Sequence, residues 1–111
     1  SNDSSSGIQN FLCKNNLEDT FTYFWSADNQ PHKPDPLAVK KLCQQMNLPP
    51  YECALIGDAD SDLFMARQSG IGITLGYTGG WTQTPLLTQH NYLIKNWNDL
   101  TVSRSNLRLL P

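Results

Sequence analysis

The chain has 111 residues, which is enough for one small domain with a modest hydrophobic core. Eight basic and ten acidic residues give a net charge of −2 without any basic block, so neither a nucleic-acid nor a membrane partner is indicated. No apolar stretch is long enough to span a membrane, and no signal-peptide pattern opens the chain at Ser1.

The first half of the chain predicts two helices with a strand and a loop between them. Apolar residues at helical spacing indicate the helices, and the aromatic run Thr-Phe-Thr-Tyr-Phe-Trp is typical of a strand. Asp35 followed by Pro36 is a good helix start, because proline is tolerated at the first helical position. The predicted order is a helix over 4–16, a strand over 20–26, a loop over 27–35 and a helix over 36–46.

The second half predicts alternating strands and helices. The predicted order is a buried strand over 53–56, a helix to about 69, a strand over 71–75, a loop over 76–84, a helical turn over 85–88, a strand over 92–94 and a turn over 97–100. Gly70 is expected to stop the helix. This alternation predicts a parallel α/β sheet in one domain, 1–100. The tail, 101–111, is polar with a weak leucine repeat, and its composition allows disorder.

The most informative stretch is Gly57-Asp58-Ala-Asp60-Ser-Asp62, where the strand over 53–56 passes into a helix. In open α/β sheets, ligands bind at the carboxyl ends of the strands. Carboxylates crowded there repel one another unless a cation or protons intervene. Mg²⁺ suits such a place, because it prefers one or two carboxylates together with water and a substrate phosphate. A divalent-metal site is therefore the leading interpretation.

Two other interpretations of this stretch compete with the metal site. Asp60 and Ser61 are residue types that cap helices, and Asp60 is otherwise expected to be solvated. A calcium loop fails, because Leu63 stands where that motif needs glycine and Ser69 where it needs glutamate. Elsewhere the sequence favours ordinary roles: solvated loop positions for the two histidines, turns for the glycines of 76–80, and core or subunit contacts for the three tryptophans.

The three cysteines, Cys13, Cys43 and Cys53, follow neither a Cys-x-x-Cys spacing nor a disulfide pattern. Their number is odd, and free cysteines in protein interiors behave as small apolar residues. We therefore expect all three to be buried, in a protein of a reducing compartment, the cytoplasm.

With Lys33-Pro-Asp-Pro36 ahead of Gly57-Asp58-Ala-Asp-Ser-Asp62, the chain resembles the haloacid dehalogenase superfamily, and within it the phosphoglycolate-phosphatase-like members. The continuation from Leu63 to Gly70 is also similar, and the resemblance extends from Ser1 to about residue 100. It implies a three-layer, Rossmann-like parallel sheet. It also implies Mg²⁺-dependent hydrolysis of a small-molecule phosphate ester through an aspartyl-phosphate.

The resemblance further implies a role for each matching residue. Asp58 is similar to the metal-binding aspartate, and Asp62 to the second acidic position, which holds the metal's waters or its neighbours. Lys33 is similar to the lysine that steadies the nucleophile and the transferring phosphoryl group. Ser1, with the backbone amide of Asn2, is similar to the phosphate-oxygen binder. Phosphoryl transfer needs mainly positioning and charge neutralisation, which such groups provide.

The family's first motif, an Asp-x-Asp at the end of the first strand, is absent, and with it the nucleophile and the general acid/base. In the family that strand lies beside the one at 53–56, so its absence leaves 20–26 without a neighbour. We therefore expect an incomplete core domain, the C-terminal part of a larger enzyme that is inactive alone. The alternatives are a non-catalytic binding or regulatory remnant and an α/β interaction domain without phosphate chemistry. Substrate identity and oligomeric state are not specified by the sequence.

Overall fold

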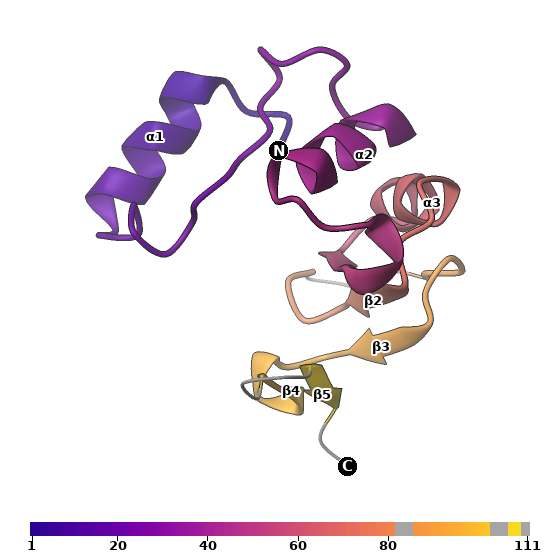
Figure 1. Ribbon diagram of the computed structural model, residues 1–111. Helices are drawn as coiled ribbons and strands as arrows, with labels where there is room; N and C mark the ends of the chain where they lie inside the picture. Colours follow the sequence, from indigo (N-terminus) through magenta and orange to yellow (C-terminus); the bar gives the residue numbers. More distant parts are fainter. Residues whose placement is uncertain (82–85, 103–106, 110–111) are drawn as a thin grey trace.

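The computed structural model describes residues 1–81 and 86–102 and the backbone of the strand at 107–109. Its elements in chain order are α1 (Ser5–Lys14), α2 (Pro36–Gln45), the 3₁₀ turn η1 (Pro50–Glu52), β1 (Ala54–Gly57), α3 (Asp60–Gln68), β2 (Ile73–Tyr77), β3 (Tyr92–Ile94), the 3₁₀ turn η2 (Trp97–Asp99), β4 (Leu100–Val102) and β5 (Leu107–Leu109) (Figure 1). Among the described residues, no helix is both long enough and apolar enough to cross a bilayer.

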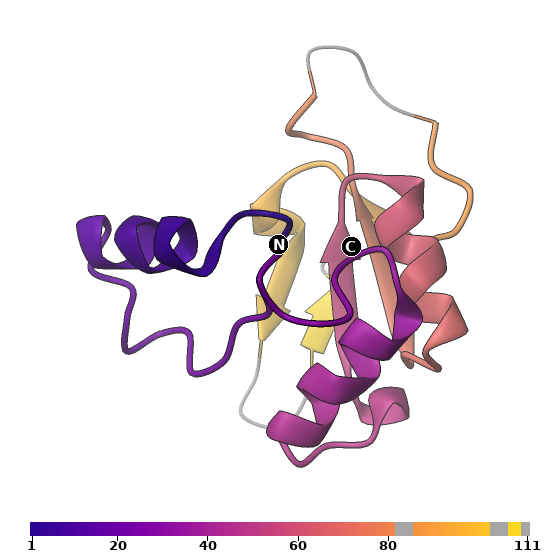
Figure 2. The ribbon, with the colours of Figure 1, turned by 90° about the horizontal axis from the view of Figure 1, so that it is seen from above.

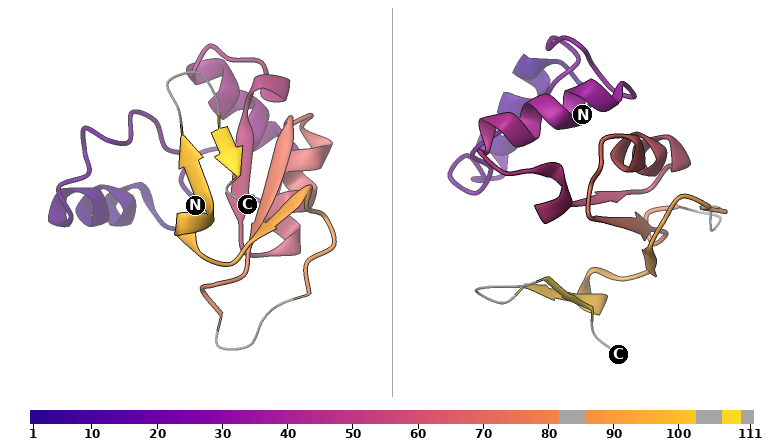
Figure 3. Two further views of the ribbon diagram at one scale, coloured as in Figure 1. Left: turned by 90° about the horizontal axis from the view of Figure 1, so that it is seen from below. Right: turned by 45° about the vertical axis from the view of Figure 1, so that its right-hand side comes forward.

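Strands β1, β2 and β3 form a parallel sheet in that order, which confirms the predicted parallel α/β class. Ile56 of β1 lies beside Leu75 of β2, and Leu75 in turn lies beside Tyr92 of β3. Figures 1 and 3 show α2 and α3 on one side of this sheet and the antiparallel pair β4–β5 on the other. Helix α1 stands apart from the sheet (Figure 2). The fold is therefore a layered α/β unit with one helix to its side.

The hydrophobic core lies where α2, α3 and β1 meet. Val39 and Cys43 of α2 pack with Met65 of α3. Four partly buried apolar residues join this cluster: Met46, Cys53, Leu55 and Ile71. Leu63 of α3 and Leu75 of β2 are 0% exposed, so the contact between helix and sheet is closed to solvent at both positions.

The two helices that cover the sheet begin and end at residues suited to helix termini. Asp35 precedes α2, and its carboxylate accepts a hydrogen bond from the Leu37 amide at 2.9 Å. Pro36 is the first residue of α2, as predicted. Gly70 follows the end of α3 with a φ of 82°, a left-handed conformation that glycine adopts without a steric cost. The predicted stop at Gly70 is confirmed.

Most predicted elements occur within about two residues of their expected bounds, but several predictions differ from the structure. Residues 20–26 form no strand, since no described strand lies beside them to complete a ladder of hydrogen bonds. Residues 86–88 form no helical turn, and Pro85 lies outside the described residues. β2 includes the first two residues of the predicted loop 76–84, whose last three are likewise outside. The polar tail, 101–111, includes the last two residues of β4 and, at 107–109, β5.

The prediction that all three cysteines are buried is wrong for Cys13, which is exposed on α1. Cys43 is buried and Cys53 is half-buried. Helix α1 stands apart from the sheet, so only part of its surface is covered by protein. A hydrogen bond with Glu18 raises the pKa of the Cys13 thiol.

Asp60, the first residue of α3, holds the segment 88–89 against the start of that helix. Its carboxylate accepts hydrogen bonds from the Thr88 amide (2.8 Å), the Thr88 hydroxyl (2.7 Å) and the Gln89 amide (3.2 Å). These bonds, chiefly the one from the Thr88 hydroxyl, lower the pKa of Asp60 from its ordinary value. The interpretation of Asp60 as a helix cap is therefore wrong, because Ala59 occupies the N-cap position and makes no side-chain cap. Asp60 is partly exposed, but its carboxylate is engaged by residues 88–89 as well as by solvent.

Replacing Leu63 with alanine should lower the free energy of unfolding by about 2–5 kcal/mol, because the removal of a side chain shielded from solvent leaves a cavity. The matched control is Phe64→Ala at the next position of α3, where the side chain is 51% exposed and its loss should cost much less. Urea titrations of both variants measure the two values. Equal losses would contradict the described orientation of α3.

Asp60→Asn should lower the melting temperature at neutral pH, and this effect should shrink as the pH falls below about 4. The pKa of Asp60 is lower in the folded protein than in the unfolded chain. Its stabilising contribution is therefore present above the unfolded pKa and is lost as the pH falls through the folded one. Thermal melts between roughly pH 7 and pH 3 measure this. Asp19→Asn, at an exposed position, is the control. A pH-independent difference for Asp60→Asn would contradict the assignment.

Candidate active site

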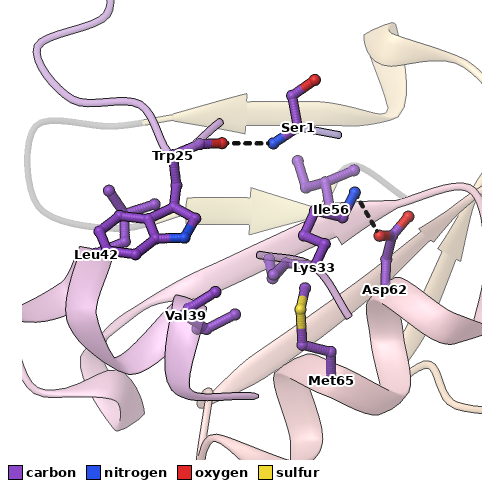
Figure 4. A pocket seen from close by; sticks show the side chains of 10 residues that line it. Ser1, Trp25, Lys33, Val39, Leu42, Ile56, Asp62 and Met65 are labelled. Atoms are coloured by element: carbon purple, nitrogen blue, oxygen red, sulfur yellow. Dashed lines mark hydrogen bonds and ion pairs between the residues drawn. The ribbon is translucent and has the colours of Figure 1, made fainter. Parts of the chain in front are cut away.

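A cavity of about 200 Å³ opens between the segment 25–33, α2, and the junction of β1 with α3. Its lining residues are Ser1, Trp25, Lys33, Ala38, Val39, Leu42, Leu55, Ile56, Asp62 and Met65 (Figure 4). Trp25 and Leu42 lie at one end of the cavity, and Lys33 and Asp62 lie at the other. The cavity is therefore largely apolar, with its charged groups gathered at one end.

Lys33 and Asp62 form an ion pair, with 2.7 Å between Nζ and Oδ1. Lys33 comes from the loop before α2, and Asp62 comes from the first turn of α3. Their side chains are 28% and 16% exposed, so the pair is partly removed from water and its attraction is stronger than that of a surface pair. The structure therefore brings together two of the predicted site residues, which are 29 positions apart in the sequence.

Gly57 allows Asp62 to lie this close to the end of β1. A Cβ atom at position 57 would lie 2.8 Å from the Cβ of Asp62, which is too short for two carbon atoms. Any side chain at position 57 would therefore displace the first turn of α3. The glycine of the Gly-Asp motif thus has a steric role in the site.

Ser1 also lines the cavity, together with Lys33 and Asp62. Its amino group donates a hydrogen bond to the Trp25 carbonyl at 2.9 Å, and its hydroxyl accepts one from the Asp3 amide at 3.0 Å. Asn2 is exposed and does not line the cavity, so its role in phosphate binding stays a prediction.

Asp58, the predicted metal ligand, is exposed at the end of β1 and is not among the residues that line the cavity. In the described part of the chain, no three His, Cys, Asp or Glu side chains are grouped closely enough to hold a metal ion. A closed protein cage for a metal is therefore not formed by these residues. A site with Asp58 as its protein ligand would suit Mg²⁺, because this ion is usually held by one or two carboxylates and takes its remaining ligands from water and a phosphate.

Two tryptophans are not core residues, which leaves their expected alternative role in subunit contacts untested, and one histidine is not solvated as expected. The Trp81 ring is 50% exposed, and its Nε1 donates to the Asp58 carbonyl at 3.0 Å. Trp97, 55% exposed, stacks on Tyr77 with 4.4 Å between ring centroids. The Nδ1 atom of His90 is buried without a hydrogen-bond partner among the described residues, so His90 is not a solvated loop histidine.

Sequence reasoning missed the two tryptophans that contact the site. Trp25 lines the cavity, and its Nε1 donates to the Pro31 carbonyl at 2.6 Å, which joins the two ends of the segment 25–31. Trp81 reaches the Asp58 carbonyl across 23 positions of the chain. No local sequence signal indicates either contact, because both depend on how distant segments meet.

A family model described as haloacid dehalogenase-like hydrolase matches residues 1–75. A phosphoglycolate phosphatase of Vibrio vulnificus is 29% identical over 83 residues, which cover 71% of this chain and 36% of that protein. A phosphoglycolate phosphatase of Chromobacterium violaceum is 35% identical over 63 residues, which cover 55% of this chain and 28% of that protein. The chain thus spans about a third of the length of the curated relatives it matches.

Solved structures show the same fold. A haloacid dehalogenase superfamily hydrolase of subfamily IA from Geobacter sulfurreducens superposes with a TM-score of 0.70 at 23% identity, over 85% of this chain and 45% of that one. A haloacid dehalogenase-like protein from Agrobacterium tumefaciens gives a TM-score of 0.68 at 23% identity, over 86% and 47%. With the family match over 1–75, the chain belongs to the haloacid dehalogenase-like hydrolases, and its resemblance to phosphoglycolate phosphatases is confirmed.

Proposed function

We propose that this chain is the C-terminal part of a Mg²⁺-dependent phosphatase that hydrolyses a small, phosphoglycolate-like phosphate monoester. In this proposal the reaction passes through an aspartyl-phosphate whose nucleophile lies outside the chain. The observation that carries the proposal is the Lys33–Asp62 pair, which sets an ammonium group at one end of a cavity beside the carboxyl end of β1. Ligands of parallel α/β sheets bind at that edge.

Lys33 is the group that neutralises charge on the phosphoryl group in this proposal. Its Nζ is held by Asp62 at 2.7 Å, so the ammonium is already in place before a substrate arrives. Ser1, on the same cavity, would bind a phosphate oxygen together with the amide of Asn2. Asp62 acts as a positioning residue, because it orients the lysine.

Asp58 would hold Mg²⁺, which when bound supplies charge neutralisation for the phosphate oxygens. The carboxylate is exposed at the end of β1 and is therefore accessible to an ion and its waters. The Trp81 indole supports the neighbouring backbone, because its hydrogen bond fixes the Asp58 carbonyl. The Asp58 side chain takes no part in the ion pair between Lys33 and Asp62.

Two observations support a nucleophile from outside the chain. Among the described residues that line the cavity, Asp62 is the only carboxylate, and it is already paired with Lys33. Within the described sheet, β1 has β2 on one side only, so its other edge is available to a further strand. The first observation also favours a second candidate function, a non-catalytic phosphate-binding remnant of such an enzyme.

Exposed apolar side chains on α1 and on the segment 20–26 also support the proposal that the chain is part of a larger domain. Phe11, Phe21 and Tyr23 are 61%, 52% and 45% exposed. They lie on α1 and on the segment 20–26, which the sequence predicts as a strand but which has no neighbouring strand in the described structure. Apolar side chains clustered at a surface mark a place where further protein packs.

Assays of the 111-residue chain, beside a version extended by its upstream coding sequence, test this function. The extended version should hydrolyse a generic phosphate ester in a metal-dependent manner, and the 111-residue chain should not. In the extended version Lys33→Ala should reduce turnover roughly 10²–10³-fold, the loss typical of one preorganised group. Lys40→Ala, on the exposed side of α2, is the matched control. Metal-dependent turnover by the 111-residue chain that Asp58→Ala abolishes would contradict the outside nucleophile. Unchanged turnover in Lys33→Ala would contradict its role.

Millimolar Mg²⁺ should raise the melting temperature of the extended version by preferential binding to the folded state. Asp58→Asn should abolish this rise. It should leave the metal-free melting temperature unchanged or slightly higher, because it removes one of three closely spaced carboxylates. Asp19→Asn is the control and should keep the full response to Mg²⁺. If Mg²⁺ does not shift the melting of the unsubstituted protein, the metal assignment is wrong.

A further inference from the structure

Two of the three cysteines lie in contact beneath α2. The Sγ atoms of Cys43 and Cys53 are 3.9 Å apart. Cys43 lies near the end of α2 and is 3% exposed, whereas Cys53 directly precedes β1 and is half-buried. Both pack in the apolar cluster that joins α2, α3 and the sheet. The pair therefore connects a helix and a strand ten positions apart through two free thiols.

The Sγ atoms are close to each other, and the main chains on both sides of the pair are fixed by hydrogen bonds. A disulfide needs about 2.05 Å between its sulfur atoms, so the Sγ atoms would have to approach by roughly 1.9 Å. Rotation about the Cα–Cβ bonds moves a sulfur atom by this order. Cys43 is inside a helix, and the Cys53 amide donates to the Pro50 carbonyl at 2.9 Å, so both main chains are held while the side chains turn.

The two thiols differ in how readily they react. Burial, and after it the proximity of Cys53, raises the pKa of Cys43 to about 11. The thiolate is the attacking species in thiol–disulfide exchange, so Cys43 is a slow nucleophile at neutral pH. Cys53 is the less buried of the two, and an external oxidant therefore meets it first. Cys13 lies on α1, which stands apart from both.

We propose that Cys43 and Cys53 are a modification site, at which a low-molecular-weight disulfide forms a reversible intramolecular bridge. The Cys53 thiolate attacks one sulfur of the oxidant, the sulfur–sulfur bond of the oxidant breaks, and one thiol leaves. Cys43 then loses its proton and attacks the Cys53 sulfur of this mixed disulfide, and the second thiol leaves. Two protein thiols are oxidised, one oxidant disulfide is reduced to two thiols, and excess thiol reverses the process.

The bridge would act on the cavity wall as well as on stability. Val39 and Leu42 of α2 line the cavity. Val39 lies one turn before Cys43, and Leu42 lies directly before it. Linking Cys43 to Cys53 would join this part of α2 covalently to the start of β1. The wall formed by α2 would then be fixed relative to β1, which is followed by Asp58 and then by Asp62 in the first turn of α3.

Incubation of the folded chain with oxidised glutathione, followed by alkylation and peptide mapping, tests the proposal. The expected product has Cys43 and Cys53 peptides joined and a mass lower by two hydrogens at that pair, while Cys13 carries glutathione or the alkyl group. The bridged form should melt about 5 °C or more above the reduced form, because the cross-link restricts the unfolded chain. Dithiothreitol should reverse both changes.

Two cysteine variants and a measurement in denaturant test the same proposal, so that the test still decides if one core substitution impairs folding. Cys43→Ala should leave Cys53 as a mixed disulfide with glutathione, and Cys53→Ser should leave Cys43 as a free thiol. In concentrated guanidinium chloride the yield of the bridge at the same glutathione concentration should fall. The proposal is overturned if the folded chain accumulates glutathione on Cys53 beside an unmodified Cys43. It is also overturned if the bridge forms equally well in denaturant, or if all disulfides run between chains through Cys13.

Discussion

The ion pair between Lys33 and Asp62 is the contact on which the site depends. It joins the loop before α2 to the first turn of α3, across the end of β1. A lysine that lines a mostly apolar cavity loses part of its hydration, and the carboxylate at 2.7 Å offsets that loss. Without Asp62, Lys33 would be more stable turned toward water. Without Lys33, the carboxylates that follow β1 would repel one another more strongly.

The packing behind this pair explains why the two charges meet. Met65 lies one turn after Asp62 on α3 and contacts Val39 of α2, so the core between the two helices sets the separation of their first turns. Lys33 immediately precedes the segment that leads into α2. The apolar cluster therefore positions the charged groups, and the charged groups in turn close one end of the cavity.

The helices and the parallel sheet could be predicted because their signals are local. Asp35-Pro36 and Gly70 mark helix ends by their own stereochemistry, and apolar runs mark strands. The strand expected at 20–26 is absent because a strand exists only where a neighbour completes its hydrogen bonds, and sequence pattern contains no information about that neighbour. The contacts of Asp60 with Thr88 and of Trp81 with the Asp58 carbonyl could not be predicted for the same reason, because each joins segments that are distant in the sequence. Of the predicted site residues, Ser1, Lys33 and Asp62 share one cavity, and Asn2 and Asp58 lie outside it.

The close approach of Gly57 to the Asp62 Cβ has an evolutionary consequence. Asp62 pairs with Lys33 from its present position, and its Cβ leaves no room for a side chain at position 57. The choice of residue at 57 is therefore coupled to the choice at 33, although these two residues are linked only through a third. Substitutions at the three positions should show epistasis. A larger residue at position 57 should be tolerated only in lineages in which position 33 is no longer a lysine.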